Sequence, residues 1–143
     1  MRYTEILDLV RDEAGLSDRQ SADAVLKATL RTLAERMPDA TAEHFAAQLP
    51  DEAAEEMDRS THHTADTEER ERGEKFDLTT FAGRVAWRSR TDEETALRHA
   101  AAVFEVLDDA VAPELMVKLR DVLPADVVEL LPIARAEPPG EGT

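Results

Sequence analysis

The sequence contains no cysteine, and this absence removes several kinds of chemistry at once. Without thiols the chain forms no disulfides, binds no zinc through thiolates and has no cysteine nucleophile. Its five glycines form neither the G-x-G-x-x-G nor the G-x-x-x-x-G-K-[ST] pattern of phosphate-binding loops. No stretch approaches the roughly 18 consecutive apolar residues that a membrane-spanning helix requires, and the N-terminus shows no apolar signal segment. We therefore expect a cytoplasmic protein with no membrane segment and no cofactor.

Positive charge is also scarce. The 17 lysines and arginines stand against 32 aspartates and glutamates, which gives a formal net charge of -15 at neutral pH. The acidic excess is spread along the chain rather than held in a tail. Such a surface repels phosphate groups, so we expect neither nucleic acid nor an anionic membrane as a partner.

What the sequence does contain is one apolar pattern that occurs twice. The matching residues are Ala22, Leu26, Thr29, Leu30, Leu33 and Met37 in the first copy and Ala96, Ala100, Val103, Phe104, Leu107 and Val111 in the second. A repeat with a period of about 74 residues indicates two copies of one structural unit. A single copy of about 57 residues would be marginally stable, so we expect the two copies to pack together.

Each copy predicts four helices. In the first copy, 3.6-residue spacing indicates helices at about 3–14, 17–37, 41–48 and 51–57, and Gly15 has the position of a left-handed helix end. In the second copy, Asp77 is the expected cap of the first helix, and further helices follow at about 92–112, 113–122 and 125–131. Ser17 and Thr91 begin the two patterns that resemble capping boxes. The predicted fold class is all-α, with two tandem copies of a four-helix unit packed together and about eight helices.

This pattern divides the chain into four segments. Residues 1–57 form helical repeat 1, and residues 76–131 form helical repeat 2. Residues 58–75 are polar and highly charged and are predicted to be a linker. Residues 132–143 end in Pro, Gly and Glu, cannot bury an apolar face and are predicted to be a disordered tail.

Several of these features resemble a prokaryotic family known as domain of unknown function 2267. The resemblance covers residues 1 to about 133. It rests on Ile6 or Phe81 at the first buried helix position, on the turn at residues 15–18, on the long Ala/Leu-rich helix, and on the Gln-Leu-Pro sequence at 48–50. Repeat 2 departs from the pattern, with Arg90 in the turn and Val122 in place of Gln48. The family implies an all-α tandem fold and brings no reaction, cofactor or catalytic residue.

Catalytic and metal-binding patterns are weak. His62 and His63 are adjacent in the predicted linker, and neighbouring residues do not converge on one metal ion as an i, i+4 helical pair does. His44 and His99 lie at unrelated positions of the two copies, without a nucleophile placed beside them by the pattern. We therefore predict no catalytic residue, no metal site and no enzymatic activity.

The strongest functional signal lies where the two copies differ. At six positions the second copy replaces a polar residue of the first by an apolar one. The candidate interface residues are Trp87, Leu97, Val106, Leu115, Val117 and Leu130. Something must cover these side chains: the first repeat, a second copy of the chain, or a different protein.

The predicted function is therefore that of a non-enzymatic cytoplasmic helical interaction or scaffold protein, which binds a protein partner or itself through repeat 2. An alternative is an accessory or regulatory subunit of an enzyme, which would dock a basic partner on its acidic faces. A small metal-dependent hydrolase is a third and weaker reading, because no cluster of ligands supports it.

Overall fold

The computed structural model of the chain describes residues 1–61 and 76–131. Within these ranges it forms eight helices and no strand, so the all-α prediction is confirmed. The helices are α1 (Tyr3–Ala14), α2 (Arg19–Arg36), α3 (Asp39–Gln48), α4 (Asp51–Thr61), α6 (Leu78–Ser89), α7 (Glu93–Ala110), α8 (Pro113–Val122) and α9 (Ala125–Val128). Among the described helices, none has both the length and the apolar character needed to cross a membrane.

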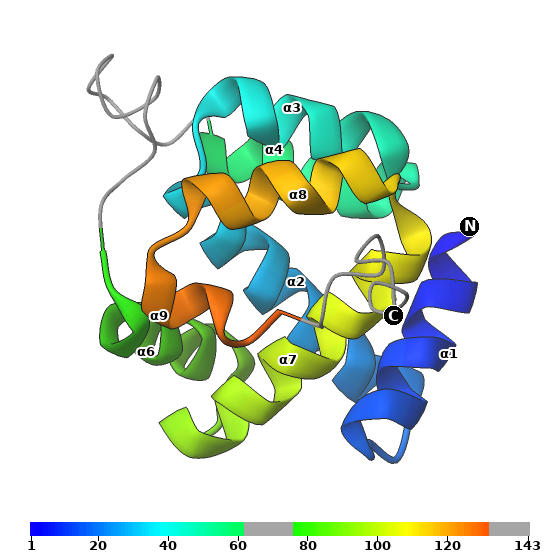
Figure 1. The fold of residues 1–143 in the computed structure, drawn as a ribbon. Coiled ribbons are helices and arrows are strands. Elements are labelled where there is room, and N and C mark those ends of the chain that lie inside the picture. Colours follow the sequence, from blue (N-terminus) through cyan, green and yellow to red (C-terminus); the bar gives the residue numbers. More distant parts are fainter. Residues whose placement is uncertain (62–75, 132–143) are drawn as a thin grey trace, which may run out of the picture.

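The helices of the two halves interleave. The first helix of each half packs against the long second helix of the other half, so that α1 lies on α7 and α6 lies on α2. The pairs α2 with α7 and α3 with α8 also touch across the two halves, and Figure 1 shows α3 and α8 running next to each other. This reciprocity is what an approximate twofold relation between the halves produces. The close superposition of the two halves stays a prediction.

The repeated apolar residues form the core. Leu26, Leu30 and Phe104 are at most 1% exposed, and one hydrophobic cluster extends through both halves. The rings of Phe81 and Phe104 lie 6.2 Å apart between centroids and join α6 to α7. Burying each such side chain contributes about 1.5–3 kcal/mol. A shared core of this kind makes each half the main cover of the other.

The helix ends follow the sequence with one correction. Gly15 ends α1 in the left-handed region, as predicted, and Asp77 caps α6 through a bond from the Thr80 amide at 3.1 Å. The predicted capping roles of Ser17 and Thr91 are wrong. Asp18 caps α2, because its side chain accepts a hydrogen bond from the amide of Ser21 at 2.8 Å. In the second half Asp92 caps α7 in the same way and accepts from the amide of Thr95 at 2.7 Å. The Thr91 amide instead donates to the carbonyl of Ala86, which closes α6.

Leu49-Pro50 separates α3 from α4, and Leu123-Pro124 separates α8 from α9; we call these two turns the Leu-Pro corners. Next to them lie polar contacts between the halves that the sequence pattern does not predict. The side-chain oxygen of Gln48 accepts a hydrogen bond from the amide of Ala112, at 2.7 Å, just before α8 begins. In the other direction, a side-chain oxygen of Asp126 accepts from the amide of Leu78 at the start of α6, at 3.1 Å. Each corner therefore satisfies a free amide at the helix start of the opposite half.

The last helix of each half differs from its predicted range. α4 continues to Thr61, beyond the predicted boundary at residue 57, and α9 ends at Val128 rather than at residue 131. After α9, the backbone amides of Leu130 and Leu131 donate hydrogen bonds to the carbonyl groups of Val127 and Val128, three residues earlier in each case. Residues 62–75 of the predicted linker and the predicted tail at 132–143 lie outside the described residues.

Candidate functional site

Trp87 is the most exposed large apolar side chain among the described residues. It lies on α6, whose opposite face buries Phe81 and Val85 in the core, and 84% of its surface is accessible. The helix is fixed at its start by Asp77 and along its length by α2 and α7. The indole is therefore presented on a rigid element rather than on a loop.

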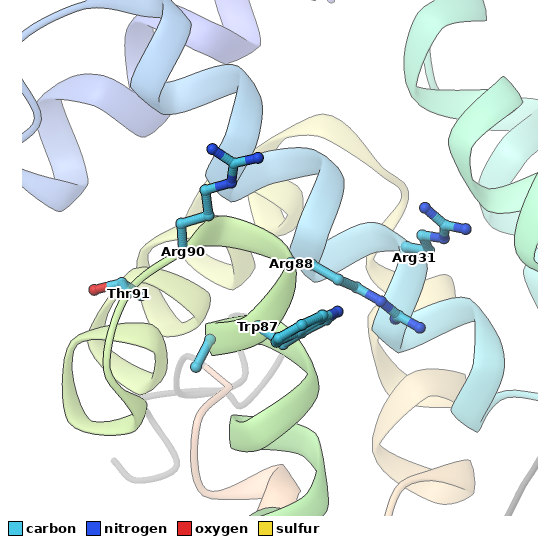
Figure 2. Close-up of a pocket in the computed structure, with 6 residues that line it drawn as sticks. Arg31, Trp87, Arg88, Arg90 and Thr91 are labelled. Carbon is cyan, nitrogen blue, oxygen red and sulfur yellow. The ribbon is translucent and has the colours of Figure 1, made fainter.

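An open groove of about 640 Å³ adjoins the indole. Its lining residues, which we call the Trp87 surface, are Arg31, Ala86, Trp87, Arg88, Arg90 and Thr91. Figure 2 shows Arg31 extending from α2 and the other residues coming from α6 and its end, with Arg31 and Arg90 on either side of Trp87. Three arginines thus surround one tryptophan on a chain whose net charge is -15.

Arg88 is held in place by Glu35 of α2. Its two terminal nitrogens donate to the two carboxylate oxygens of Glu35 at 2.9 and 2.6 Å, and one of them also donates to the hydroxyl of Thr32 at 2.9 Å. Arg84, one turn earlier on α6, donates to the same carboxylate at 2.9 Å. Burial would raise the pKa of Glu35, but the hydrogen bonds and charges of Arg88 and Arg84 outweigh it and hold the pKa below its ordinary value.

The other two arginines of the Trp87 surface are bound much less tightly. Arg31 faces Glu56 across a long separation of 4.0 Å, its side chain is 36% exposed, and its Nε is without a hydrogen-bond partner among the described residues. Arg90 is exposed; its backbone amide donates to the carbonyl of Ala86, but its side chain has no hydrogen bond or ion pair within the described part of the chain. Their charges are therefore available to an anionic group.

The groove continues along α2. An adjoining hollow of about 290 Å³ shares Arg31 and Arg88 with the Trp87 surface and adds Lys27, which is paired with Asp23 at 3.2 Å. The buried carboxylate of Glu56 lies at its edge. A band of positive side chains therefore extends from Arg90 towards Lys27.

Arg90 is the one described residue other than glycine with a positive φ, 60°. The two copies align with an offset of 75 residues up to the turn at residues 15–17 and of 74 residues after it, which we call the repeat alignment. In this alignment the corresponding position of the first half is Gly15, with a φ of 70°. A left-handed conformation costs a residue with a Cβ about 1–2 kcal/mol. Glycine would adopt this backbone conformation at a lower free-energy cost than arginine. An arginine at this position therefore suggests that its side chain serves a purpose other than the stability of the fold.

We therefore predict that Arg90→Gly makes the protein more stable, by about 1 kcal/mol, because it relieves this backbone conformation. Urea unfolding followed by circular dichroism measures the change. Gly15→Ala is the matched control and should lose about 1 kcal/mol. An added Cβ at Gly15 meets no atom within 4 Å, so its cost is that of the backbone alone. A destabilised Arg90→Gly protein would contradict the prediction.

The six predicted interface residues do not gather in one place. Trp87 and Val117, 84% and 46% exposed, lie on α6 and α8 respectively. Leu97 and Leu130 are half-buried, whereas Val106 and Leu115 belong to the core, at 4% and 6% exposed. Of the six, Trp87 alone belongs to the Trp87 surface.

The arginines of this surface were not predicted as site residues. Arg31 reaches it from the other half of the chain, which no local pattern reveals. A signal for Arg90 and Arg88 does exist in the sequence: in the repeat alignment they stand where the first half has Gly15 and Glu13. The second half thus has arginines where the first half has a glutamate and a glycine, directly next to a tryptophan that the first half lacks. This difference between the copies marks the surface.

The histidines do not contribute to this site. His62 and His63 lie outside the described residues, and His44 is exposed on α3. Burial and the charge of Arg98 lower the pKa of His99 on α7 against the opposing effect of Asp92. Within residues 1–61 and 76–131, no group of three or more histidine or carboxylate side chains is arranged to hold a metal ion.

Comparison with known families gives a match over most of the chain. The sequence profile of a family described as "Uncharacterized conserved protein (DUF2267)" matches residues 3–130, which is most of the chain. No curated protein matches the sequence.

Proposed function

The chain belongs to the DUF2267 family of uncharacterized conserved proteins, and from this premise we propose that it is a non-enzymatic helical interaction or scaffold protein of the cytoplasm. We propose further that the Trp87 surface is where it binds another protein. The observation that carries the proposal is the 84% exposed indole on a rigid helix, surrounded by arginines.

Residue chemistry supports a protein partner. Tryptophan and arginine are the side chains most enriched among the few interface residues that dominate binding energy. A tryptophan supplies a large apolar area that loses little conformational entropy on binding, because it has only two rotatable bonds. Because the indole of Trp87 leaves most of this area in water, its burial by a partner would contribute a large favourable free energy of binding.

The shape of the groove favours a macromolecule over a small ligand. Pockets for small molecules bury about 70–90% of the ligand surface and are lined mainly by apolar groups. Here the indole projects outward, and the lining is dominated by arginines with one alanine and one threonine. A partner that also contacts the surroundings of the groove would cover this surface more completely.

The test is a comparison of captured proteins. Lysate of the native cells is passed over three immobilised proteins: the wild type, Trp87→Ala and Lys118→Ala. Lys118 is the control position, because it is exposed on α8 and does not line the groove. We expect proteins that are retained by the wild type and by Lys118→Ala and that are depleted at least about tenfold by Trp87→Ala. Identical retention by all three proteins would contradict the proposal.

A further inference from the structure

The Trp87 surface has a counterpart on the other half of the molecule. Because α1 packs on α7 as α6 packs on α2, the Trp87 surface has a counterpart on α7, on α1 and just after α1. In the repeat alignment Trp87 corresponds to Asp12, Arg88 to Glu13, Arg90 to Gly15, Arg31 to Glu105 and Ala86 to Arg11, and the neighbouring Arg84 corresponds to Leu9. Where the Trp87 surface has Trp87, Arg88 and Arg31, its counterpart thus has the three carboxylates of Asp12, Glu13 and Glu105.

This counterpart, which we call the α1–α7 face, consists of Leu9, Asp12, Glu13 and Glu105. All four side chains are exposed, and Leu9, at 40%, is one of the few large apolar side chains that the described residues leave in water. Asp12 has a neighbouring partner in Arg11 at 3.1 Å, whereas Glu13 and Glu105 extend into solvent. The face therefore offers carboxylates around an apolar side chain.

We propose that the Trp87 surface of one molecule binds the α1–α7 face of a second copy. In this contact the carboxylates of Glu13 and Glu105 meet the guanidinium groups of Arg31 and Arg90, and Leu9 covers part of the indole of Trp87. The proposal rests on the function proposed above and names its partner. The supporting observation is complementarity of charge between two exposed sets of side chains of the same chain, each of which includes an exposed large apolar residue.

The contact joins two different faces, so it leaves one face of each kind unoccupied at the two ends of an open assembly. A symmetric dimer through two Trp87 surfaces would place arginines against arginines, and one through two α1–α7 faces would place carboxylates against carboxylates. Contacts between unlike faces build either closed rings or open chains of subunits. The expected assembly is thus head-to-tail and depends on concentration.

Two variants that each lose one face test the proposal. The first is Trp87→Ala, which keeps the α1–α7 face and removes the only tryptophan of the chain. The second combines Leu9→Ala, Glu13→Gln and Glu105→Gln, which keeps the Trp87 surface. All of these positions are exposed, so circular dichroism should show folded proteins for both. Because the first variant has no tryptophan, the tryptophan fluorescence of a mixture, excited selectively over Tyr3, comes from Trp87 of the second variant alone.

Sedimentation velocity at physiological salt is the main measurement, at concentrations up to about 0.5 mM, where weak association still registers. Wild-type protein should form dimers and larger species as its concentration rises. Each variant alone should remain a monomer, with self-association weakened at least about 30-fold. A mixture of the two should form a one-to-one dimer and nothing larger, and the emission of Trp87 should shift to shorter wavelength as the tryptophan-free variant is added.

Two further variants separate a role in assembly from a role in folding. Arg90→Gly should weaken self-association about tenfold although it stabilises the fold, which a purely structural arginine could not do. Lys118→Gln removes the same charge from α8, away from both faces, and should assemble like the wild type.

Three outcomes would overturn the proposal: a wild type that stays monomeric over the whole concentration range, self-association by either blocked variant alone, or a mixture that forms no dimer. If the wild type stays monomeric while proteins captured from lysate still depend on Trp87, the second copy is the wrong partner and the function proposed above stands. If neither behaviour is found, both proposals fail.

Discussion

Replacing Phe104 by alanine is expected to lower the free energy of unfolding by about 4 kcal/mol. Phe104 lies in the middle of α7, has no exposed surface and packs its ring against that of Phe81. Alanine would leave a cavity in the one cluster that both halves share. Because that cluster is continuous, we expect one cooperative unfolding transition, in the variant as in the wild type.

Urea unfolding followed by circular dichroism gives the size of the effect, and hydrogen exchange shows where it acts. Amides in α1 and α2 should lose protection together with those of α7, although Phe104 belongs to the second half. Val117→Ala is the control, since this side chain is 46% exposed on α8 and should cost less than about 0.5 kcal/mol. Two separate transitions, or loss of protection confined to residues 76–131, would show that the halves are independent units.

Replacing Glu35 by alanine is the second large effect, and we expect it to cost about 2–3 kcal/mol. This carboxylate accepts three hydrogen bonds from Arg84 and Arg88, and its removal deprives both guanidinium groups of this anionic partner at the contact of α2 with α6. Arg88 would also lose the partner that orients it beside Trp87.

A double-mutant cycle with Arg88→Ala isolates the pair. Each single variant should be strongly destabilised, and the double variant should lose clearly less than the sum of the two. Glu43→Ala, at an exposed position of α3, is the matched control and should change stability by less than about 0.5 kcal/mol. Additive effects at Glu35 and Arg88 would show that the ion pair contributes nothing to the fold.

The lowered pKa of Glu35 also makes stability depend on pH. A carboxyl group whose pKa is lower in the folded state binds its proton more readily in the unfolded state, so acid favours unfolding. The stabilisation by Glu35 is complete above its ordinary pKa of 4.5 and is lost as the pH falls through the lower folded value. Glu35→Gln should therefore lose less stability than the wild type between about pH 5 and pH 3.

Most of the fold could be predicted because its signals are local. The 3.6-residue spacing and residues such as Gly15 and Pro113 set helix ends within a few positions. The predicted caps of α2 and α7, Ser17 and Thr91, are wrong by one residue, because serine or threonine next to aspartate offers two good caps and geometry chooses between them. In both places the aspartate is the cap.

The candidate site could be predicted only in part. A change from polar to apolar between the copies identified Trp87, but the same rule also selected Val106 and Leu115, which are buried. Their counterparts explain why: Thr32 and Thr41 of the first half are themselves at most 2% exposed. The hydroxyl of Thr32 donates to the carbonyl of Ala28, which lets a polar side chain occupy a core position.

Exposure, unlike polarity, is largely kept between corresponding positions. Asp12 and Trp87 are both exposed, and Glu43 and Val117 are both exposed. An apolar replacement therefore points to an interface only where the original residue faced water. The approach of Arg31 to Trp87 could not be predicted at all, because it depends on how α2 and α6 pack across the halves.

The packing of α1 on α7 also sets an order of events during synthesis of the chain. α1 ends at Ala14 and packs on α2, which follows it directly, but also on α7, which begins at Glu93, so most of the chain must leave the ribosome before the buried face of α1 is fully covered. Domains usually fold as whole units as they emerge. A nascent chain stalled at residue 61 should therefore remain sensitive to protease in α1, and protection should appear only once α7 has been released.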